Sequence, residues 1–245
     1  MKKRIIKRIC IGIGIVLVLL VALYILFVNF LQEKAMVLEQ EFAHIEDLVQ
    51  RDTIDYNRIY YYTDRTVLDG TFGAVERATK NYIRDVYKEL EGLETILSSL
   101  EFQGLLSAEA ILEDGPLFTN SQAYVEQTRE ELQQTKDKLL SLLEQDKIME
   151  YFDDVQGFLS GIIQEELEKS ITDDFQNTKE DVEVFINTLD DYLVLVSNTM
   201  TFLTNHQDSW EFDGEYITFA TDELYNTYEA FITRMNDLSY QLNSI

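Results

Sequence analysis

An uninterrupted apolar run near the start of the chain constrains its structure most. From Ile9 to Phe30 the sequence contains no Asp, Glu, Lys or Arg. A helix of this length, rising about 1.5 Å per residue, crosses a hydrocarbon core of about 30 Å. The run is longer than the apolar region of a secretory signal peptide, about 7–15 residues, and no small-x-small cleavage pair follows it. We therefore expect an uncleaved transmembrane signal anchor at 9–30.

The charges that flank this run predict its orientation. Five basic residues precede it: Lys2, Lys3, Arg4, Lys7 and Arg8. After it, Lys34 is the only basic residue before Arg51. Short segments rich in Lys and Arg stay on the cytoplasmic side of a membrane. We therefore expect a cytoplasmic basic tail at 1–8 and one extracytoplasmic domain at 31–245, in a single-pass protein of the cell membrane.

The chain after the apolar run is strongly acidic. All 45 Asp and Glu residues follow Phe30, whereas five of the 20 basic residues precede it, so the outer part carries a formal charge of −30. Such a surface repels nucleic acids and anionic lipid headgroups, which excludes a nucleic-acid-binding role. The only cysteine, Cys10, lies within the apolar run. The outer part therefore has no disulfide, which favours a bacterial envelope protein over a small secreted animal domain.

Apolar residues recur at helical spacing directly after the membrane segment. Steps of 4, 3, 4, 3 and 4 residues connect Leu31, Ala35, Leu38, Phe42, Ile45 and Val49. This heptad pattern predicts a stalk helix whose apolar stripe packs against another helix. The closing segment from Leu224 to Leu242 has the same steps. We expect the first and last helices to pack together in one chain, with a homodimeric stalk as the alternative.

Further helices are expected between these two. Apolar stripes and capping residues predict long helices from Phe72, from Asn120 or Ser121 and from Thr172, a short helix at 102–112, and a kink or new helix at 145–149. The pattern over 51–73 is less regular, and the sequence Glu-Asp-Gly-Pro at 113–116 is a stop signal. One proline and ten glycines in 245 residues leave few helix breakers. The composition is typical of an all-α protein.

One segment departs from the helical pattern. Alternating residues surround Asp213-Gly214 from Trp210 to Phe219, which predicts a β-hairpin at about 210–219. Thr221 is the expected N-cap of the final helix. The predicted fold is therefore all-α, with an N-terminal transmembrane helix that continues into an elongated antiparallel helical bundle or coiled coil and one small hairpin.

No pattern in the sequence predicts a catalytic, cofactor-binding or metal-binding residue. Glu41-x-x-His44 has the spacing of a di-iron ligand pair, but such sites need two of these motifs and two further glutamates. The acidic pairs lie outside any calcium-loop pattern, and the signatures of serine nucleophiles and phosphate-binding loops are absent. We therefore expect neither enzymatic activity nor a cofactor.

Two groups of aromatic residues are the candidates for contact with a partner. Tyr60, Tyr61 and Tyr62 are consecutive, and Trp210 lies in the predicted hairpin. Three successive residues cannot all face one core, so at least one tyrosine should be exposed. Exposed aromatic side chains often anchor protein partners. The alternative for each group is packing within the protein's own core.

These features together predict a membrane-anchored extracytoplasmic scaffold or protein-protein interaction subunit of a bacterial cell envelope, without enzymatic activity. Its expected partners are the membrane and another envelope protein, with homo-oligomerisation through the stalk as a further expectation. The alternative function is an extracytoplasmic ligand-binding or sensory domain that signals through a membrane partner. The short cytoplasmic tail has no room for an output domain, so the sensory alternative needs that partner.

Overall fold

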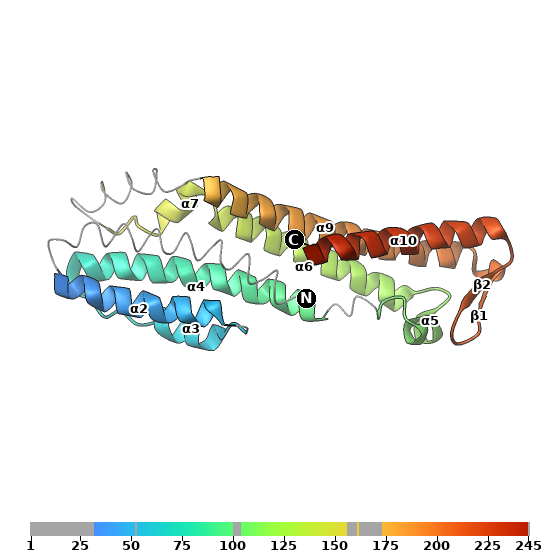
Figure 1. Cartoon of the computed structure of the whole chain (residues 1–245), viewed down its shortest axis with the longest axis horizontal. Helices are drawn as coiled ribbons and strands as arrows, with labels where there is room; N and C mark the ends of the chain where they lie inside the picture. The colour runs from blue at the N-terminus through green and yellow to red at the C-terminus, as the bar shows by residue number, and fades with distance from the viewer. Residues whose placement is uncertain (1–31, 52, 100–103, 156–160, 162–172, 245) are drawn as a thin grey trace. The chain divides into compact units, whose positions relative to one another are not determined.

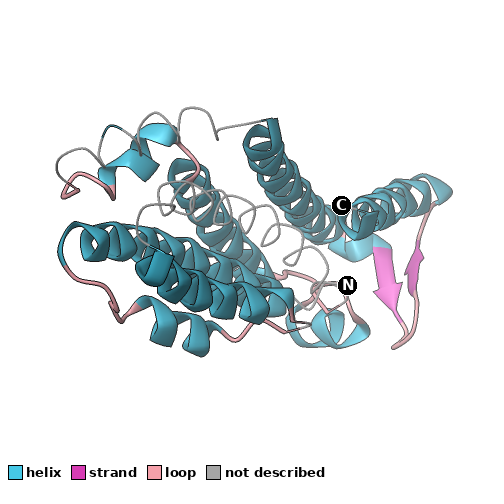
Figure 2. Cartoon of the chain, turned by 60° about the vertical axis from the view of Figure 1, so that its left-hand side comes forward, coloured by secondary structure: helices cyan, strands magenta, loops and turns pink. Residues whose placement is uncertain are grey.

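The computed structural model describes residues 32–51, 53–99, 104–155, 161 and 173–244. In this part of the chain eight α-helices, one 3-10 helix and two short strands are found (Figures 1 and 2). The predominantly helical fold predicted from the sequence is confirmed. Within the same described residues, none of the helices is both long and apolar enough to cross a bilayer. The basic tail at 1–8 and the predicted span at 9–30 lie outside the described residues.

The chain divides into two compact units. Unit 1 comprises Met1–Glu94 and Lys136–Glu183, and unit 2 comprises Thr95–Thr135 and Val184–Ile245. All three boundaries between the units fall within long helices, and each unit consists of two separate stretches of chain. The predicted single domain at 31–245 stays a prediction. The predicted pairing of the first and last helices also stays a prediction, because these helices belong to different units.

The described residues of unit 1 form six helical segments. They are α2 (Gln32–Gln50), α3 (Tyr56–Thr63), most of α4 (Gly70–Ser99), the end of α6 (Thr119–Leu142), α7 (Gln145–Glu150) and the start of α9 (Asp173–Asn205). α2 and α3 lie along α4 in Figure 1. The core of this unit is mainly apolar and includes Ile59, Tyr82, Val86, Tyr87, Leu90 and Leu139.

Residues 51–73, over which the apolar pattern is less regular, are partly helical in the structure. This segment contains a two-turn helix, α3, because Asp55 caps its start by accepting a hydrogen bond from the Arg58 N–H at 3.1 Å. The short helix predicted at 102–112 is α5 (Ala108–Asp114). The new helix predicted near 145–149 is confirmed as α7. The start of α3, which the apolar pattern did not indicate, is thus fixed by a local cap.

The predicted apolar stripes are largely buried, with one informative deviation in α2. In α6 and α9 every described residue of the predicted stripe is buried. In α2 the predicted stripe residues Ile45 and Val49 are buried, but Phe42 is only half-buried, whereas Glu41 and Leu48 beside the stripe are buried. The buried face of α2 is thus rotated from the predicted seam and includes a carboxylate.

Unit 2 contains the hairpin and the last helix. Strands β1 (Trp210–Phe212) and β2 (Ile217–Phe219) pair antiparallel, which confirms the predicted hairpin. Gly214 takes the positive φ of +101° that the turn requires, and the Asp213 carboxylate accepts hydrogen bonds from the Glu215 and Tyr216 N–H groups. The final helix, α10 (Asp222–Ser244), starts after the predicted cap, whose hydroxyl accepts a hydrogen bond from the Leu224 N–H at 3.4 Å.

Candidate functional site

The three consecutive tyrosines of α3 point in three directions, because successive side chains on a helix are about 100° apart. Tyr60 faces α4 and donates a hydrogen bond to the Glu91 carboxylate at 2.6 Å. Tyr62 stacks on the ring of His44 in α2, with 5.3 Å between ring centroids. Tyr61 lies between them and is 61% exposed. The prediction that at least one tyrosine is exposed is confirmed, and that residue is Tyr61.

The side chain of Arg65 contacts the rings of both Tyr61 and Tyr62. Its guanidinium carbon lies 5.1 Å from the centroid of the Tyr61 ring and 4.7 Å from that of Tyr62. Both distances are within the range of a cation-π interaction. The two rings also meet edge to face at 5.4 Å. Tyr61, Tyr62, Arg65 and His44 form a continuous group that we call the Tyr61 surface.

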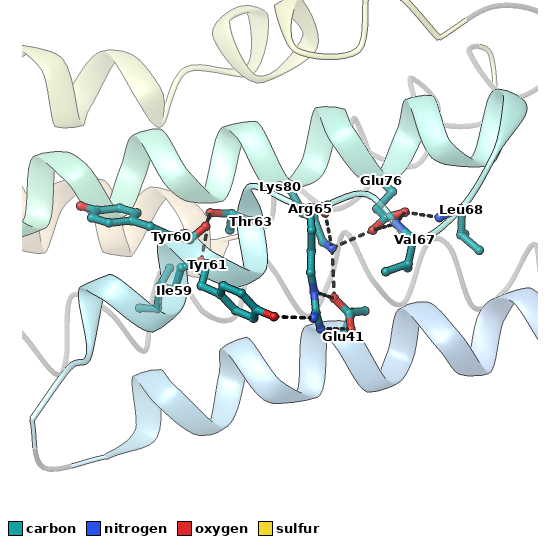
Figure 3. Close-up of polar contacts among 10 residues, drawn as sticks. All are labelled: Glu41, Ile59, Tyr60, Tyr61, Thr63, Arg65, Val67, Leu68, Glu76 and Lys80. Atoms are coloured by element: carbon teal, nitrogen blue, oxygen red, sulfur yellow. Dashed lines mark hydrogen bonds and ion pairs between the residues drawn. The ribbon is translucent and has the colours of Figure 1, made fainter.

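A carboxylate beneath this surface holds Arg65 in position. The Glu41 carboxylate accepts two hydrogen bonds from the guanidinium, at 2.5 Å and 3.1 Å (Figure 3). This bidentate geometry fixes the guanidinium plane as well as its position. Because Glu41 is only 8% exposed on α2, the orientation of Arg65 is set by the packed interior of unit 1.

Glu41 belongs to a larger buried ionic cluster. Lys80 of α4 is 0% exposed, and its ammonium nitrogen lies 3.2 Å from Glu41 and 2.7 Å from Glu76. The same nitrogen donates to the backbone carbonyl of Arg65 at 2.9 Å. The three donors of the Lys80 ammonium therefore each have an acceptor. We call Glu41, Arg65, Glu76 and Lys80 the ionic cluster.

Glu76 connects this cluster to the segment before α4. Its carboxylate accepts hydrogen bonds from the backbone N–H groups of Val67, at 3.0 Å, and Leu68, at 2.9 Å (Figure 3). Two carboxylates and two cations balance in formal charge. Buried charges are tolerated when they are paired and hydrogen-bonded in this way. The cluster therefore ties α2, the 64–69 connection and α4 together.

The environment of Glu41 changes its acidity. Burial raises the pKa of this carboxyl group, but the hydrogen bonds and charges of Arg65 and Lys80 outweigh burial and hold the pKa below its ordinary value. Tyr60 shows the opposite effect, because burial and the hydrogen bond to Glu91 both raise the pKa of its phenol. Glu41 is thus ionised, and Tyr60 is neutral, at physiological pH.

The predicted contact residue Trp210 has a structural role in unit 2. Its indole N–H donates a hydrogen bond to the Leu203 carbonyl at 2.8 Å, which attaches β1 to the last turn of α9. The rings of Phe219 and Tyr228 meet at 5.2 Å and connect β2 to α10. Trp210 is half-buried, so only part of its ring remains available to a partner.

Sequence reasoning did not identify the ionic cluster. Glu41 was placed outside the apolar stripe, and Arg65 and Lys80 carried no pattern that distinguished them from other basic residues. The i, i+4 spacing of Glu76 and Lys80 is visible in the sequence. That spacing is equally typical of an exposed surface pair, so it could not show that these two charges are buried.

The side chains of the Glu41-x-x-His44 pair contact other protein side chains. Glu41 accepts from Arg65 and Lys80, and the His44 ring stacks on Tyr62. In the part of the chain that the structure describes, no group of three or more His, Cys, Asp or Glu side chains is placed to hold a metal ion.

Comparisons with known proteins gave no relative. No protein-family model, no curated protein and no solved structure matches this chain.

Proposed function

We propose that this protein is a membrane-anchored, extracytoplasmic scaffold or interaction subunit of a bacterial cell envelope, without enzymatic activity. Its sequence supports the anchor through the apolar run at 9–30 and the basic residues before it. The acid-rich chain after the run supports a location away from nucleic acids and anionic lipid. The helical part then serves to contact another envelope protein.

The observation that carries this proposal is the Tyr61 surface. Tyrosine and arginine are enriched among the residues that dominate binding energy in protein interfaces. Here an exposed tyrosine lies under the guanidinium of Arg65, at 5.1 Å, and Arg65 is itself bound by the buried Glu41. A side chain that is already fixed loses less conformational entropy when a partner binds. The Tyr61 surface is thus already ordered before a partner binds, which favours its use as a docking site.

Photo-crosslinking in cells tests this proposal. A photoreactive amino acid replaces Tyr61 in the full-length protein, and Leu112 of α5 provides the control position because its exposure, 66%, is similar to the 61% of Tyr61. We expect a defined protein adduct from position 61 and none of the same mass from position 112. If both positions give no protein adduct, docking through the Tyr61 surface is wrong.

A pair of matched variants tests the role of Arg65. Arg65→Lys keeps the charge but loses the planar, bidentate contact with Glu41 and the stacking on the tyrosines. Arg84→Lys is the control, because Arg84 belongs to the same unit and has nearly the same exposure, 37% against 38%. We expect adduct formation at position 61 to fall in Arg65→Lys and to remain in Arg84→Lys. Equal yields in both variants would remove the observation that carries the proposal.

The membrane orientation has a test of its own. A reporter enzyme that is active only in the cytoplasm, fused after Ile245, should be inactive, whereas one that is active only outside should work. A melting temperature of the full-length protein that rises with a small molecule would instead support the ligand-binding alternative, since a ligand stabilises the state that binds it.

A further inference from the structure

The segment from Thr204 to Arg234 is regular in structure but contains no buried residue. It comprises the last two residues of α9, the 3-10 helix Gln207–Ser209, both strands of the hairpin and the first half of α10, all of which the structure describes. In the second half of α10, by contrast, Met235, Leu238 and Leu242 are buried. Phe202 of α9 packs against Phe219 and Phe231, but no described residue buries the rest of the hairpin and the first half of α10. We call this region of unit 2 the hairpin face.

The hairpin face carries many apolar side chains. Tyr216 is 63% exposed and Tyr225 is 47% exposed. Phe212, Ile217, Leu224 and Ile232 are half-buried. Part of this apolar area is covered locally, since the rings of Phe219 and Tyr228 meet at 5.2 Å. The exposed rings of Tyr216 and Tyr225 are the apolar groups that remain most available to another molecule.

The charge of this face is almost entirely negative. Between Thr204 and Arg234 there are seven Asp and Glu residues, all exposed, and Arg234 is the single Lys or Arg, so the formal charge is −6. Among the described residues none of these seven carboxylates forms an ion pair, whereas acids elsewhere do, for example Asp190 with Arg129 at 2.7 Å. Exposed carboxylates without cations nearby attract a positively charged partner.

We propose that the hairpin face docks a segment of another protein that is rich in lysine and arginine. A second copy of this chain would bring another charge of −6 against the same surface, so charge disfavours self-association there. Anionic lipid is disfavoured for the same reason. A cationic segment instead places ammonium or guanidinium groups against the carboxylates and over the rings of Tyr216 and Tyr225, while its aliphatic stems cover the apolar side chains.

This surface is separate from the Tyr61 surface, which belongs to unit 1. The hairpin-face proposal deepens the proposed function by naming the chemistry of one partner. It rests on the proposed function in one respect, which is that the protein binds other proteins. Adducts from position 61 without any binding at the hairpin face would refute the inference alone. Binding at the hairpin face without adducts from position 61 would refute the Tyr61 surface alone.

The protein provides its own fluorescent reporter for a binding test. Trp210 is the only tryptophan of the chain, and it lies in β1 at this face. The full-length protein in non-ionic detergent is titrated with a tryptophan-free peptide of repeated Arg-Leu-Lys-Ser, and Trp210 emission is recorded. A peptide of repeated Glu-Leu-Glu-Ser is the control. We expect a saturable emission change with the cationic peptide only, weakened by salt because charge attraction is screened.

Matched charge reversals distinguish this face from the general acidity of the protein. The triple variant Glu211→Lys, Glu215→Lys, Glu223→Lys changes three exposed residues of the hairpin face. The control triple variant Glu113→Lys, Glu126→Lys, Glu130→Lys changes three exposed residues elsewhere in unit 2 and shifts the net charge equally. We expect the dissociation constant to rise at least about tenfold in the first variant and less than about twofold in the second.

A third variant tests the apolar contribution at constant charge. Tyr216→Ser with Tyr225→Ser removes both exposed rings, and we expect the dissociation constant to rise about fivefold or more, since each cation-π contact is modest at an exposed site. Unchanged far-UV circular dichroism shows that each variant is folded. Equal affinities of the two charge-reversed variants for the cationic peptide would overturn the proposal. So would a wild-type protein that sediments as a dimer and a double tyrosine variant that sediments as a monomer.

Discussion

Replacement of Lys80 by methionine should destabilise unit 1 strongly. Methionine keeps most of the length and volume of the lysine stem but removes the ammonium group that lies 2.7 Å from Glu76 and 3.2 Å from Glu41. The side chains of Lys80 and Glu76 are both 0% exposed. Removal of one partner of a buried ion pair costs about 3–5 kcal/mol, because the other charge stays in a medium of low polarity.

The remaining contacts place the expected loss near the lower end of this range. Glu76 still accepts hydrogen bonds from the Val67 and Leu68 N–H groups, and Glu41 still binds Arg65. We therefore expect the free energy of unfolding to fall by about 3 kcal/mol. In a domain of this size 1 kcal/mol corresponds to about 2–4 °C, so the melting temperature should fall by about 6–12 °C.

Lys138→Met is the matched control for this measurement. Lys138 is 61% exposed and lies 3.5 Å from Glu89, so its ion pair should contribute only about 0–1 kcal/mol. Circular dichroism of the full-length protein in non-ionic detergent measures both melting temperatures. Hydrogen exchange adds a local measurement. The Val67 and Leu68 amides should exchange faster in Lys80→Met, whereas their exchange rates should be unchanged in Lys138→Met.

The double variant Lys80→Met, Glu76→Gln isolates the effect of the unpaired charge. A neutral amide still accepts hydrogen bonds from the backbone but needs no cation, so the double variant should be more stable than Lys80→Met by at least about 1 kcal/mol. The reasoning is wrong if Lys80→Met and Lys138→Met melt within about 2 °C of each other. It is also wrong if the double variant is the less stable of the two.

Three further predictions follow from single contacts. Gly73→Ala should lower the free energy of unfolding by several kcal/mol, because a Cβ there would lie 2.3 Å from the Leu68 carbonyl oxygen. At Gly92 in the same helix a Cβ would meet nothing within 4 Å, so Gly92→Ala should stabilise the protein by about 0.5–1 kcal/mol in thermal melts. The ionised Glu41 carboxylate should stabilise the folded state, and this stabilisation should be lost as the pH falls from 4.5 through the lowered pKa of Glu41. Glu41→Gln should abolish this loss in an acid titration followed by circular dichroism. Trp210→Phe should cost about 1 kcal/mol and accelerate amide exchange in the hairpin, since it loses the hydrogen bond to the end of α9; unchanged exchange would contradict this role.

The candidate surfaces were only partly visible in the sequence. Consecutive tyrosines guarantee that one ring points outwards, and Tyr61 does so. Alternation around Asp213-Gly214 indicates a hairpin, which the structure contains. The fixation of Arg65 by Glu41 was not predictable, because these residues are 24 positions apart and neither has a distinctive local pattern.

The sequence by itself determined the features that depend on local periodicity. Apolar spacing and capping residues specify α4, α6, α9 and α10, because burial of one stripe and satisfaction of the first N–H groups are local requirements. Its charge distribution likewise determines that the chain after Phe30 is acidic. These conclusions need no knowledge of which helix lies beside which.

Only the tertiary structure decided which charges are buried. Among 45 carboxylates the sequence could not distinguish Glu41 and Glu76, because an ion pair between α2 and α4 depends on how the two helices are rotated about their axes. That rotation moved Glu41 inwards and left Phe42 half-buried. A buried charge requires a partner, and whether a charged pair such as Glu76 and Lys80 is enclosed or exposed depends on the helices that pack around it.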